Sequence, residues 1–369
     1  MAEIVIRPLQ TDYLYQLTDD TGIFQHTKFG TPDRVHGYTT DDNARALIAA
    51  VMLYKDQPDS HSLRLIGTYL AFVLHAQNDN GSFRNFMNYQ RVFIEEKGSE
   101  DCFGRCLWAL GFTLSEPSIP ANLQNTCRYM MNAALPHVLS LSSPRAMAYA
   151  MIGLSYLLET PGILTYQFPY PHVVEEMSAN QFLPRETIIT GIDTLARRLQ
   201  VQYDQYQEDS WKWFENSMTY GNAMLPWALL RASRICNIPG LQQVAKESLD
   251  FLVSHTFSSE GYFKPIGNRG WLPIHGTAAL YDEQPIEACE MLLACQEAFE
   301  IYNDHTYLLL ARQCLEWFHG RNSLRVSLID PQTGGCYDGI HAHGLNLNQG
   351  SENVVSYCIA HLAINDKSI

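Results

Sequence analysis

Doubled carboxylates occur near the starts of several predicted helices, and carboxylates are among the side chains that acid–base catalysis uses most. The acids concerned are Asp41 and Asp42, Glu100 and Asp101, Asp282 and Glu283, and the single residues Glu215 and Glu352. Capping explains one acidic residue per helix, because the orphan backbone N–H groups and the helix dipole favour a negative charge there. Pairs with Tyr, His and Asn beside them are explained less well. The set therefore indicates a functional site, while capping remains the alternative for each single residue.

Two carboxyl groups are what the cleavage of a glycosidic bond requires. One protonates the leaving oxygen, and the other activates water or attacks the sugar. Aromatic side chains in the surrounding loops would give sugar rings flat apolar surfaces. They are Phe83, Phe86, Tyr89, Trp211, Trp213, Phe214, Tyr262, Trp271 and Tyr337. Each of them could instead anchor a loop on the core, but their clustering favours a carbohydrate site.

We predict Glu215 as the general acid, because an acid beside Trp213 and Phe214 would be partly desolvated and kept protonated. Asp42 or Asp101 is the predicted base, and carboxylates spread around a wide mouth favour inversion. The predicted substrate-binding residues are Asp41, His36, Arg45, Arg105, Tyr220, Tyr281, Asp282, Glu283, Trp213, Trp271, His341, His343 and Glu352. The alternative is that Asp42 and Asp101 cap helices, with Arg45 and Arg105 as local ion-pair partners.

Other kinds of site find less support. The sequence has no phosphate-binding glycine loop, no Gly-x-Ser-x-Gly and no HExxH motif. His341 and His343 could form half of a metal site, but two histidines without evident partners more often bind substrate or nothing. We therefore predict no metal and no cofactor.

Helical periodicity dominates the chain, with Pro and Gly between the apolar stripes. The predicted helices cover about 42–56, 60–77, 101–114, 119–138, 144–159, 186–203, 221–235, 239–257, 283–300, 303–320 and 352–364, and a segment near 8–17 could supply a twelfth. No Pro/Gly/Ser-rich linker or charge block divides them. We predict a single domain over residues 1–369.

The links between helices alternate in length. Short links join 56 to 60, 114 to 119 and 235 to 239, whereas long links run from 77 to 100, 203 to 220, 257 to 281 and 320 to 351. Three long links contain a Gly-aromatic element, at Gly81, Gly261 and Gly334, and this degenerate repeat indicates stacked or circular hairpins. The predicted fold is all-α, an (α/α)6 toroid of six helical hairpins with short β-hairpins in the long loops at one mouth. An open superhelix of helix pairs is the alternative.

Composition excludes several partners. The chain has 25 Lys and Arg against 39 Asp and Glu, a formal charge of −14, and no basic cluster, so nucleic acid is not expected. No stretch approaches the roughly 20 apolar residues of a membrane span, and the N-terminus lacks a signal-peptide pattern. The nine cysteines are scattered and odd in number, as in reduced proteins. We expect a cytoplasmic protein with a carbohydrate substrate.

The predicted ring with acidic inner-helix starts resembles the six-hairpin glycosidase superfamily. Four segments, HGYTTDDNARAL, WKWFENSMTYGNAMLPWALL, YDEQPIEA and NQGSENVVSY, are similar to bacterial helical proteins often labelled glycosyltransferase-like. Similar chains occur near β-mannoside phosphorylases. The resemblance covers about residues 10–365, and it implies a carbohydrate-active enzyme, often an inverting hydrolase, with mannose-containing substrates as first candidates.

We predict a glycoside hydrolase that acts on an oligosaccharide or a bacterial glycan. A sugar epimerase or a polysaccharide lyase on the same fold would rely instead on His36, His275, His341, His343 and tyrosines. A carbohydrate-binding or glycosyltransferase-associated protein without activity would keep the aromatic side chains and use its acids only as hydrogen-bond acceptors.

Overall fold

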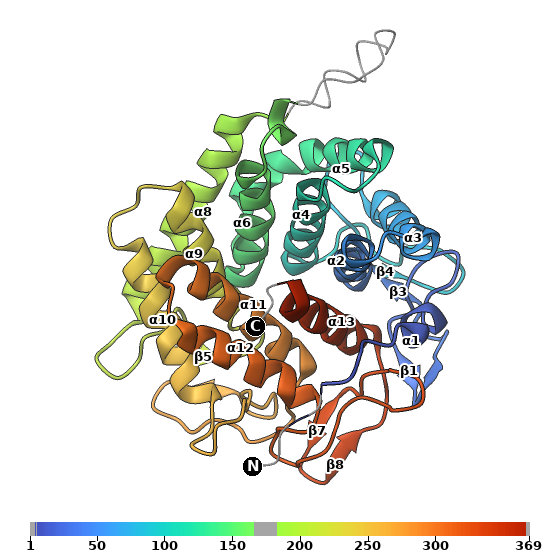
Figure 1. Ribbon diagram of the computed structural model, residues 1–369. Helices are drawn as coiled ribbons and strands as arrows, with labels where there is room; N and C mark the ends of the chain where they lie inside the picture. The colour runs from blue at the N-terminus through green and yellow to red at the C-terminus, as the bar shows by residue number, and fades with distance from the viewer. Residues whose placement is uncertain (1–3, 5, 166–182, 367–369) are drawn as a thin grey trace.

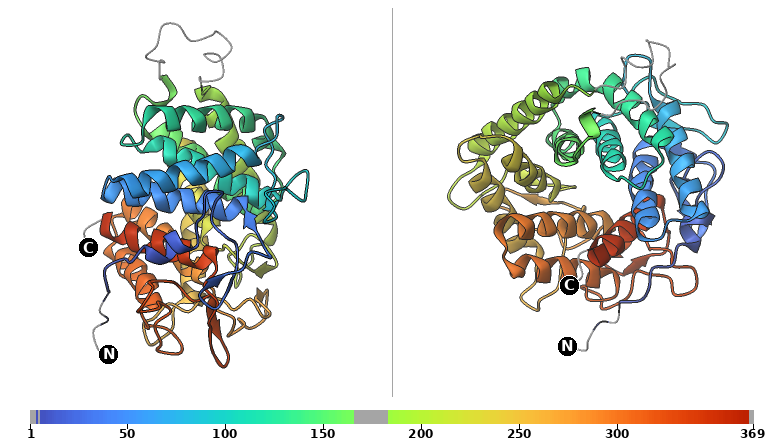
Figure 2. Two further views of the ribbon diagram at one scale, coloured as in Figure 1. Left: turned by 90° about the vertical axis from the view of Figure 1, so that its right-hand side faces the viewer. Right: turned by 45° about the horizontal axis from the view of Figure 1, so that its top comes forward.

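Six helical hairpins form a closed ring in the computed structural model, which describes residues 4, 6–165 and 183–366 (Figure 1, Figure 2). The inner helices are α2 (Thr40–Asp56), α4 (Glu100–Ser115), α6 (Pro144–Glu159), α9 (Met224–Ile235), α11 (Pro285–Tyr302) and α13 (Ser351–Asp366). The outer helices are α1 (Asp12–Gln16), α3 (Ser60–Ala76), α5 (Ala121–Ala134), α8 (Arg185–Tyr206), α10 (Leu241–Thr256) and α12 (His305–Phe318). Each inner helix packs on its two inner neighbours, and α13 closes the ring against α2. The predicted toroid is confirmed.

The predicted helix ranges agree with the structure to within a few residues. The largest difference is at 119–138, where α5 ends at Ala134 and a 3₁₀ helix follows over Leu135–Ser140. Pro136 explains this change, because it lacks the N–H that an α-helix would need there. A second short 3₁₀ helix covers Ile163–Thr165. The twelfth helix exists but has only five residues, and it covers part of α13.

The Gly-aromatic elements form the same turn after several outer helices. After α3, Asn78 N–H donates to Ser82 O at 2.8 Å, and Gly81 takes a positive φ of 88°. After α10, Ser258 N–H donates to Tyr262 O at 2.9 Å, and Gly261 has φ 77°. Glycine is required because side chains disfavour this backbone region. The repeat in the sequence is therefore a repeat of backbone geometry.

Among the described residues, four two-stranded sheets lie in the links that lead into inner helices. They pair β1 (Thr27–Lys28) with β2 (Thr31–Pro32), β3 (Tyr38–Thr39) with β4 (Phe86–Met87), β5 (Ser217–Met218) with β6 (Leu272–Pro273), and β7 (Gly339–His341) with β8 (Gly344–Asn346), all antiparallel. The first and last are the hairpins that we predicted. The other two differ from the prediction, because each joins strands from two successive long loops and so ties neighbouring hairpins together at the mouth.

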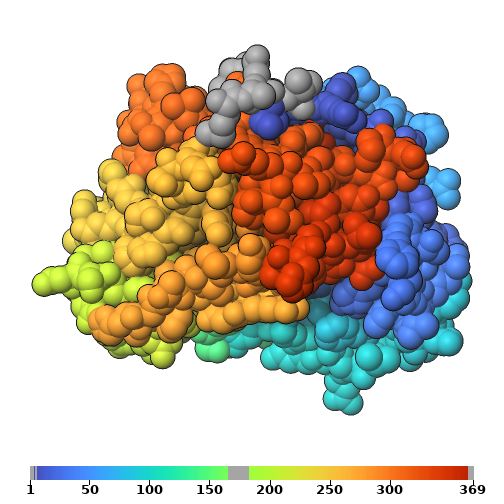
Figure 3. All heavy atoms as spheres, turned by 90° about the horizontal axis from the view of Figure 1, so that it is seen from below, coloured from blue at the N-terminus to red at the C-terminus, as the bar shows by residue number. Residues whose placement is uncertain are grey.

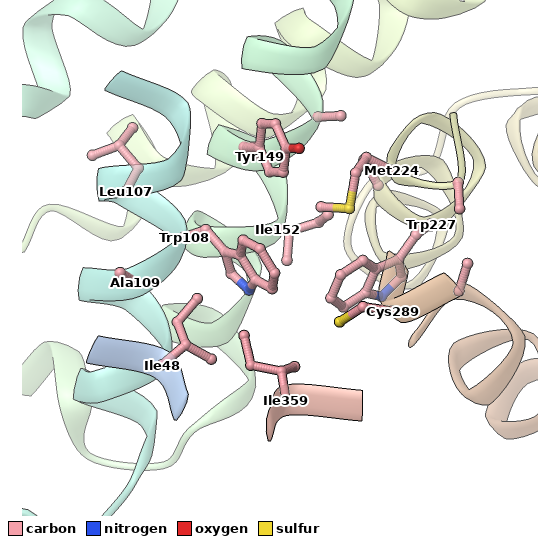
Figure 4. Close-up of a cluster of buried hydrophobic side chains, with 14 of the residues drawn as sticks. Ile48, Leu107, Trp108, Ala109, Tyr149, Ile152, Met224, Trp227, Cys289 and Ile359 are labelled. Carbon is pink, nitrogen blue, oxygen red and sulfur yellow. The ribbon is translucent and has the colours of Figure 1, made fainter. Parts of the chain in front are cut away.

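Apolar side chains from the inner helices fill the middle of the ring (Figure 4). Trp108 on α4 stacks on Tyr149 of α6, with ring centroids 5.8 Å apart, and meets Trp227 of α9 edge to face at 5.7 Å. All three side chains are buried. This packed centre separates the two ends of the ring, so the inner helix starts can form a site at one end only.

Small residues bring α4 and α6 into close contact. A Cβ atom at Gly111 would lie 2.0 Å from Gly153 O, and one at Gly153 would lie 2.2 Å from Leu107 O. Only glycine permits backbones to approach this closely. The contact fixes the spacing between the starts of these two helices, and with it the spacing of the side chains that they carry to the mouth.

Candidate active site

Hydroxyl side chains cap three inner helices, and the carboxylates that we predicted as catalytic do not. Thr39 caps α2 by accepting a hydrogen bond from the backbone N–H of Asp42, and Ser99 and Ser143 cap α4 and α6 in the same way. Asp42 and Asp101 therefore lie in the first turns with carboxylates that bind other groups. Capping by these two residues, the alternative left open by the sequence, does not describe their side-chain contacts.

A pocket of about 390 Å³ opens among the long links at the starts of α2, α11 and α13. Figure 3 shows this face, with the orange-red segment around 330–350 lying between the light orange segment around 260–285 and the blue segment around 20–40. Six of the predicted site residues line the pocket: Asp41, Asp42, Arg45, Asp282, His341 and Glu352. The other polar lining residues include His26, Asp338, Gln25, Asn268, Gln284 and Asn353.

Arg45 joins two carboxylates of this pocket across the closure of the ring. Its Nη2 lies 2.7 Å from Asp42 Oδ1, and its Nη1 lies 2.9 Å from Glu352 Oε2 on α13. Asp42 Oδ2 also accepts the hydroxyl of Thr39 at 2.6 Å. Burial and the negative charge of Asp41 raise the pKa of Asp42 to about 6, although Arg45 opposes this. Both oxygens of Asp42 are thus engaged, which suits a residue that positions others.

Asp41 is held by the second arginine of the mouth. Burial alone would raise its pKa, but the guanidinium groups of Arg105 and Arg45 hold the pKa of Asp41 below its ordinary value. Arg105 Nη1 lies 2.7 Å from Asp41 Oδ2. Asp41 is therefore ionised at neutral pH, with a carboxylate that faces the pocket.

Asp338 has the opposite character. Its Oδ1 accepts hydrogen bonds from Gly350 N and Asn353 Nδ2, both at 2.6 Å. These donors are neutral, and burial raises the pKa of Asp338. His26 lines the pocket nearby, and burial together with the adjacent His36 lowers its pKa. The pocket thus holds one carboxyl group, of Asp338, whose pKa is raised, and one, of Asp41, whose pKa is lowered.

A histidine–carboxylate pair forms a further wall of the pocket. His341 Nδ1 lies 2.5 Å from Asp282 Oδ1, and Arg269 Nε lies 2.9 Å from Asp282 Oδ2. His341 is on β7, and Asp282 comes just before α11. The two side chains are close, although among the described residues Asp282 Oδ1 has no hydrogen-bond partner, and Nε2 of His341 is available for proton transfer.

The other predicted catalytic residues form a separate cluster on the mouth. Arg145 Nη1 lies 2.5 Å from Glu215 Oε2, and Arg145 also donates to Thr219 and Tyr220. Asp101 accepts the hydroxyl of Tyr220 at 2.7 Å, and burial together with Asp101 raises the pKa of Tyr220 to about 12. This cluster does not line the pocket that holds Asp42.

The environment predicted for Glu215 is wrong. Trp213 and Phe214 are fully buried in the core, whereas the Glu215 side chain is 25% exposed and contacts a guanidinium. Adjacent side chains along an irregular loop point in different directions. The burial of Trp213 and Phe214 therefore does not desolvate Glu215, which follows them. The same finding removes Trp213 from the surfaces that could touch a substrate.

Three further predicted residues are in the wall or on the rim. Glu283 is fully buried and accepts hydrogen bonds from Trp317 and Ser323, so it fixes a loop and does not face the pocket. Tyr281 packs against the core. Trp271 is half-buried beside Tyr220, with ring centroids 6.5 Å apart.

Two predicted histidines are exposed and apart from the pocket lining. His36 contacts the ring of His26 at 4.8 Å and lies 3.8 Å from Asp33. His343 is exposed at the turn between β7 and β8. Among the described residues, no group of three or more His, Cys, Asp or Glu side chains is placed to hold a metal ion.

Sequence reasoning missed His26 and Asp338 of the pocket, and two buried acids behind it. Glu287 and Glu290 lie one turn apart on α11. Their signal in the sequence is clear in hindsight, because both stand in the apolar run PIEACEMLL, where an unpaired carboxylate is costly. Asp338 carries no such signal, since it follows a Gly-aromatic element that two other loops also have.

Larger hollows exist elsewhere on the molecule. One of about 1010 Å³ lies against α12, and one of about 550 Å³ lies at the ends of the inner helices, opposite the mouth. Their charged side chains pair with one another, for example Arg321 with Glu316 and Arg231 with Glu297. The mouth pocket differs from these hollows because one of its carboxyl groups, that of Asp338, accepts hydrogen bonds from neutral donors.

No protein family and no curated protein matches this sequence. Several solved structures are similar in fold. A cellobiose 2-epimerase from Bacillus thermoamylovorans has a TM-score of 0.70 at 10% identity, over 96% of each chain. A D-mannose isomerase has a TM-score of 0.66 at 12% identity, over 95% of this chain and 93% of that one. A GH76 α-mannanase from Bacteroides thetaiotaomicron has a TM-score of 0.62 at 9% identity, over 96% and 92%.

The chain therefore shares the (α/α)6 toroid fold of these solved structures. Identities this low describe architecture and carry no residue roles. The helices of the described residues are also too short or too polar to cross a membrane.

Proposed function

We propose that this protein is a carbohydrate-active enzyme, and specifically a glycoside hydrolase. The observation that supports this most strongly is that Asp41 and Asp338 line one pocket while their pKa values are shifted in opposite directions. Two carboxyl groups with separated pKa values are what glycosidic cleavage needs, one as acid and one as base. The solved structures of similar fold include enzymes named for cellobiose and mannose and an α-mannanase.

Asp338 is the proposed general acid. Both of its hydrogen bonds fall on Oδ1, which leaves Oδ2 to carry the proton toward a leaving oxygen. Asp41 is the proposed base, because Arg105 keeps it charged while occupying Oδ2. Arg45 would hold Asp42 and Glu352 in place, and the amides of Gln25, Asn268 and Gln284 would bind sugar hydroxyls. We propose inversion, a reaction in which enzymes generally hold the two carboxyl groups about 6.5–9.5 Å apart to leave room for the attacking water.

Reducing-sugar release from a panel of oligosaccharides, with mannose-containing ones first, tests this proposal. We expect Asp41→Asn and Asp338→Asn each to lower kcat by about 100- to 10,000-fold, because each removes one proton-transfer group. Asp193→Asn, which changes a partly exposed aspartate paired with Arg197 on α8, is the control and keeps wild-type turnover. If both pocket variants remain folded and turn over at the wild-type rate, the assignment is wrong. A proton NMR time course of the released anomer reports inversion or retention.

A sugar epimerase is the second candidate, and the His341–Asp282 pair favours it. An imidazole in the same pocket as His26 could remove and return a proton beside a carbonyl carbon. An epimerase of this kind incorporates deuterium from heavy water at the carbon next to the carbonyl, and it releases no new reducing ends. His341→Asn would then abolish the exchange, whereas in a hydrolase it changes mainly substrate affinity.

The same panel separates the remaining alternatives. A lyase produces an unsaturated product that absorbs ultraviolet light, and a binding protein retains a glycan without forming a product.

A further inference from the structure

We propose that Tyr149 and Glu290 are positioning residues, which hold Arg105 in the orientation that it needs to pair with Asp41. This inference rests on the proposed catalytic role of Asp41. It concerns groups that lie behind the pocket and touch no substrate.

A continuous chain of polar contacts runs from the pocket into the middle of the ring. Arg105 Nη1 lies 2.7 Å from Asp41 Oδ2, and Arg105 Nη2 donates to the hydroxyl of Tyr149 at 3.4 Å. The guanidinium also lies over the Tyr149 ring, 5.0 Å from its centroid. Tyr149 in turn donates its hydroxyl hydrogen to Glu290 Oε1 at 2.7 Å. Four side chains from α2, α4, α6 and α11 thus act as one unit.

The inner end of the chain is unusual for a carboxyl group. Glu290 is 2% exposed, and its Oε2 has no hydrogen-bond partner among the described residues. Burial and the nearby charge of Glu287 raise the pKa of Glu290 to about 8. Glu287 is bound separately, by the backbone N–H of Gly221 at 2.5 Å. The raised pKa favours the protonated form of Glu290, in a place where an apolar residue would avoid the cost of burial.

The neutral state of Glu290 matters for Arg105. The groups that act on Glu290 are Glu287 on its own helix, Tyr149, Arg105 and Arg45, and the thiol of Cys289 lies beside it. While Glu290 is protonated, its Oε1 accepts the hydroxyl of Tyr149 and the group carries no charge, so Arg105 pairs with Asp41. Once Glu290 ionises, its negative charge competes with Asp41 for the same guanidinium. The base then loses the partner that orients it, so kcat falls while the binding of substrate through the pocket amides is kept.

Glu290→Gln and Tyr149→Phe test the chain through the dependence of kcat on pH. Glutamine resembles the protonated acid, so we expect kcat within about twofold of wild type at neutral pH. The ratio of the kcat of Glu290→Gln to that of wild type should rise as pH increases through about 8, because only the wild-type residue ionises. Any fall of kcat with pH that is caused by the ionisation of Asp338 occurs in both proteins and therefore cancels in the ratio. A ratio that stays constant with pH overturns the proposal.

Tyr149→Phe removes the link between Glu290 and Arg105. We expect it to lower kcat about tenfold or more with KM within about threefold, since orientation and not binding is lost. The matched control is Tyr156→Phe on the same helix. The aromatic ring of Tyr156 also lies against an arginine, with Arg231 4.0 Å from its centroid, but at the end of the toroid opposite the mouth. Equal effects of Tyr149→Phe and Tyr156→Phe on kcat overturn the proposal.

Infrared spectroscopy of the unliganded protein separates failure of the chain from failure of the proposed function. Glu290 should contribute the band of a protonated carboxyl at pH 7, and the band should disappear above about pH 8. Tyr149→Phe should shift this band, because it removes the hydrogen bond to Oε1, whereas Tyr156→Phe should not. If no such band exists, the proposal is wrong whatever reaction the enzyme catalyses.

Discussion

At the scale of single residues, the arginines of the mouth matter as much as its acids. Arg45, Arg105 and Arg145 each come from the first turns of an inner helix and are almost fully buried, and each pairs with a carboxylate. A buried charge is tolerated only when it is paired and hydrogen-bonded. Arg45 and Arg105 therefore lower the pKa values of the aspartates that they contact, against the effect of burial, whereas Asp338, whose pKa burial raises, accepts hydrogen bonds only from neutral donors among the described residues.

Removing Arg45 should destabilise the whole ring. Arg45→Met leaves Asp42 and Glu352 without their shared cation, and we expect the free energy of unfolding to fall by about 3–5 kcal/mol. The control is Arg269→Met, whose side chain is 72% exposed and whose ion pair with Asp282 should contribute only about 0–1 kcal/mol. Urea denaturation measures both. Equal losses for the two variants would show that burial of the Arg45 pairs carries no extra free energy.

At the scale of elements, close helix packing sets where the mouth residues stand. Adjacent inner helices begin at the mouth, so their spacing determines the distances between the side chains of their first turns. The contact of α4 with α6 depends on Gly111 and Gly153, which each approach a backbone oxygen of the other helix.

A methyl group in this contact should be costly, although alanine favours helices more than glycine does. We expect Gly111→Ala and Gly153→Ala each to lower the free energy of unfolding by about 1–3 kcal/mol or more, because backbone must move. Gly67→Ala on α3 is the matched control, since no atom lies within 4 Å of its added Cβ. It should raise stability by about 0.5–1 kcal/mol. Thermal unfolding distinguishes the two signs.

At the scale of the whole molecule, ring closure produces the pocket, and Trp271 and Tyr220 lie at the mouth outside its lining. Segments from both ends of the chain build the pocket, because α13 packs against α2 and Gln349 N–H donates to Thr27 at 2.7 Å. The half-buried Trp271 follows the pocket residue Asn268 on the same loop and faces Tyr220. A glycan longer than the pocket would lie across these two rings.

The effect of Trp271 on substrate binding should therefore depend on the length of the substrate. We expect Trp271→Ala to raise KM about tenfold for a longer oligosaccharide, equivalent to about 1.4 kcal/mol, and to change KM for the shortest substrate less than about twofold. Tyr129→Ala, an exposed aromatic on the outer helix α5, is the control and should leave both values unchanged. The same KM increase at every substrate length would place Trp271 in the pocket itself and contradict this prediction.

Local patterns were sufficient to predict the helices, the ring and the position of several acids at its mouth. Helical periodicity and the Pro and Gly residues between apolar stripes depend on neighbours a few residues away, which the sequence displays directly, although the break at Pro136 was missed. The long links had to precede the inner helices, so acids at 41, 42, 282 and 352 were rightly expected near the mouth. That expectation followed from topology, without any knowledge of contacts.

Tertiary structure alone decided how these acids are partnered. Asp41 is charged because Arg105, 64 positions later, reaches it, whereas burial raises the pKa of Asp338, whose Oδ1 is bound by the neutral donors of Gly350 and Asn353. Glu215 was misjudged because Arg145, 70 positions away, replaces the apolar surroundings that its sequence neighbours suggested. The protonation of a buried group depends on charges within a few ångströms, and ring closure, not order along the chain, sets which charges those are.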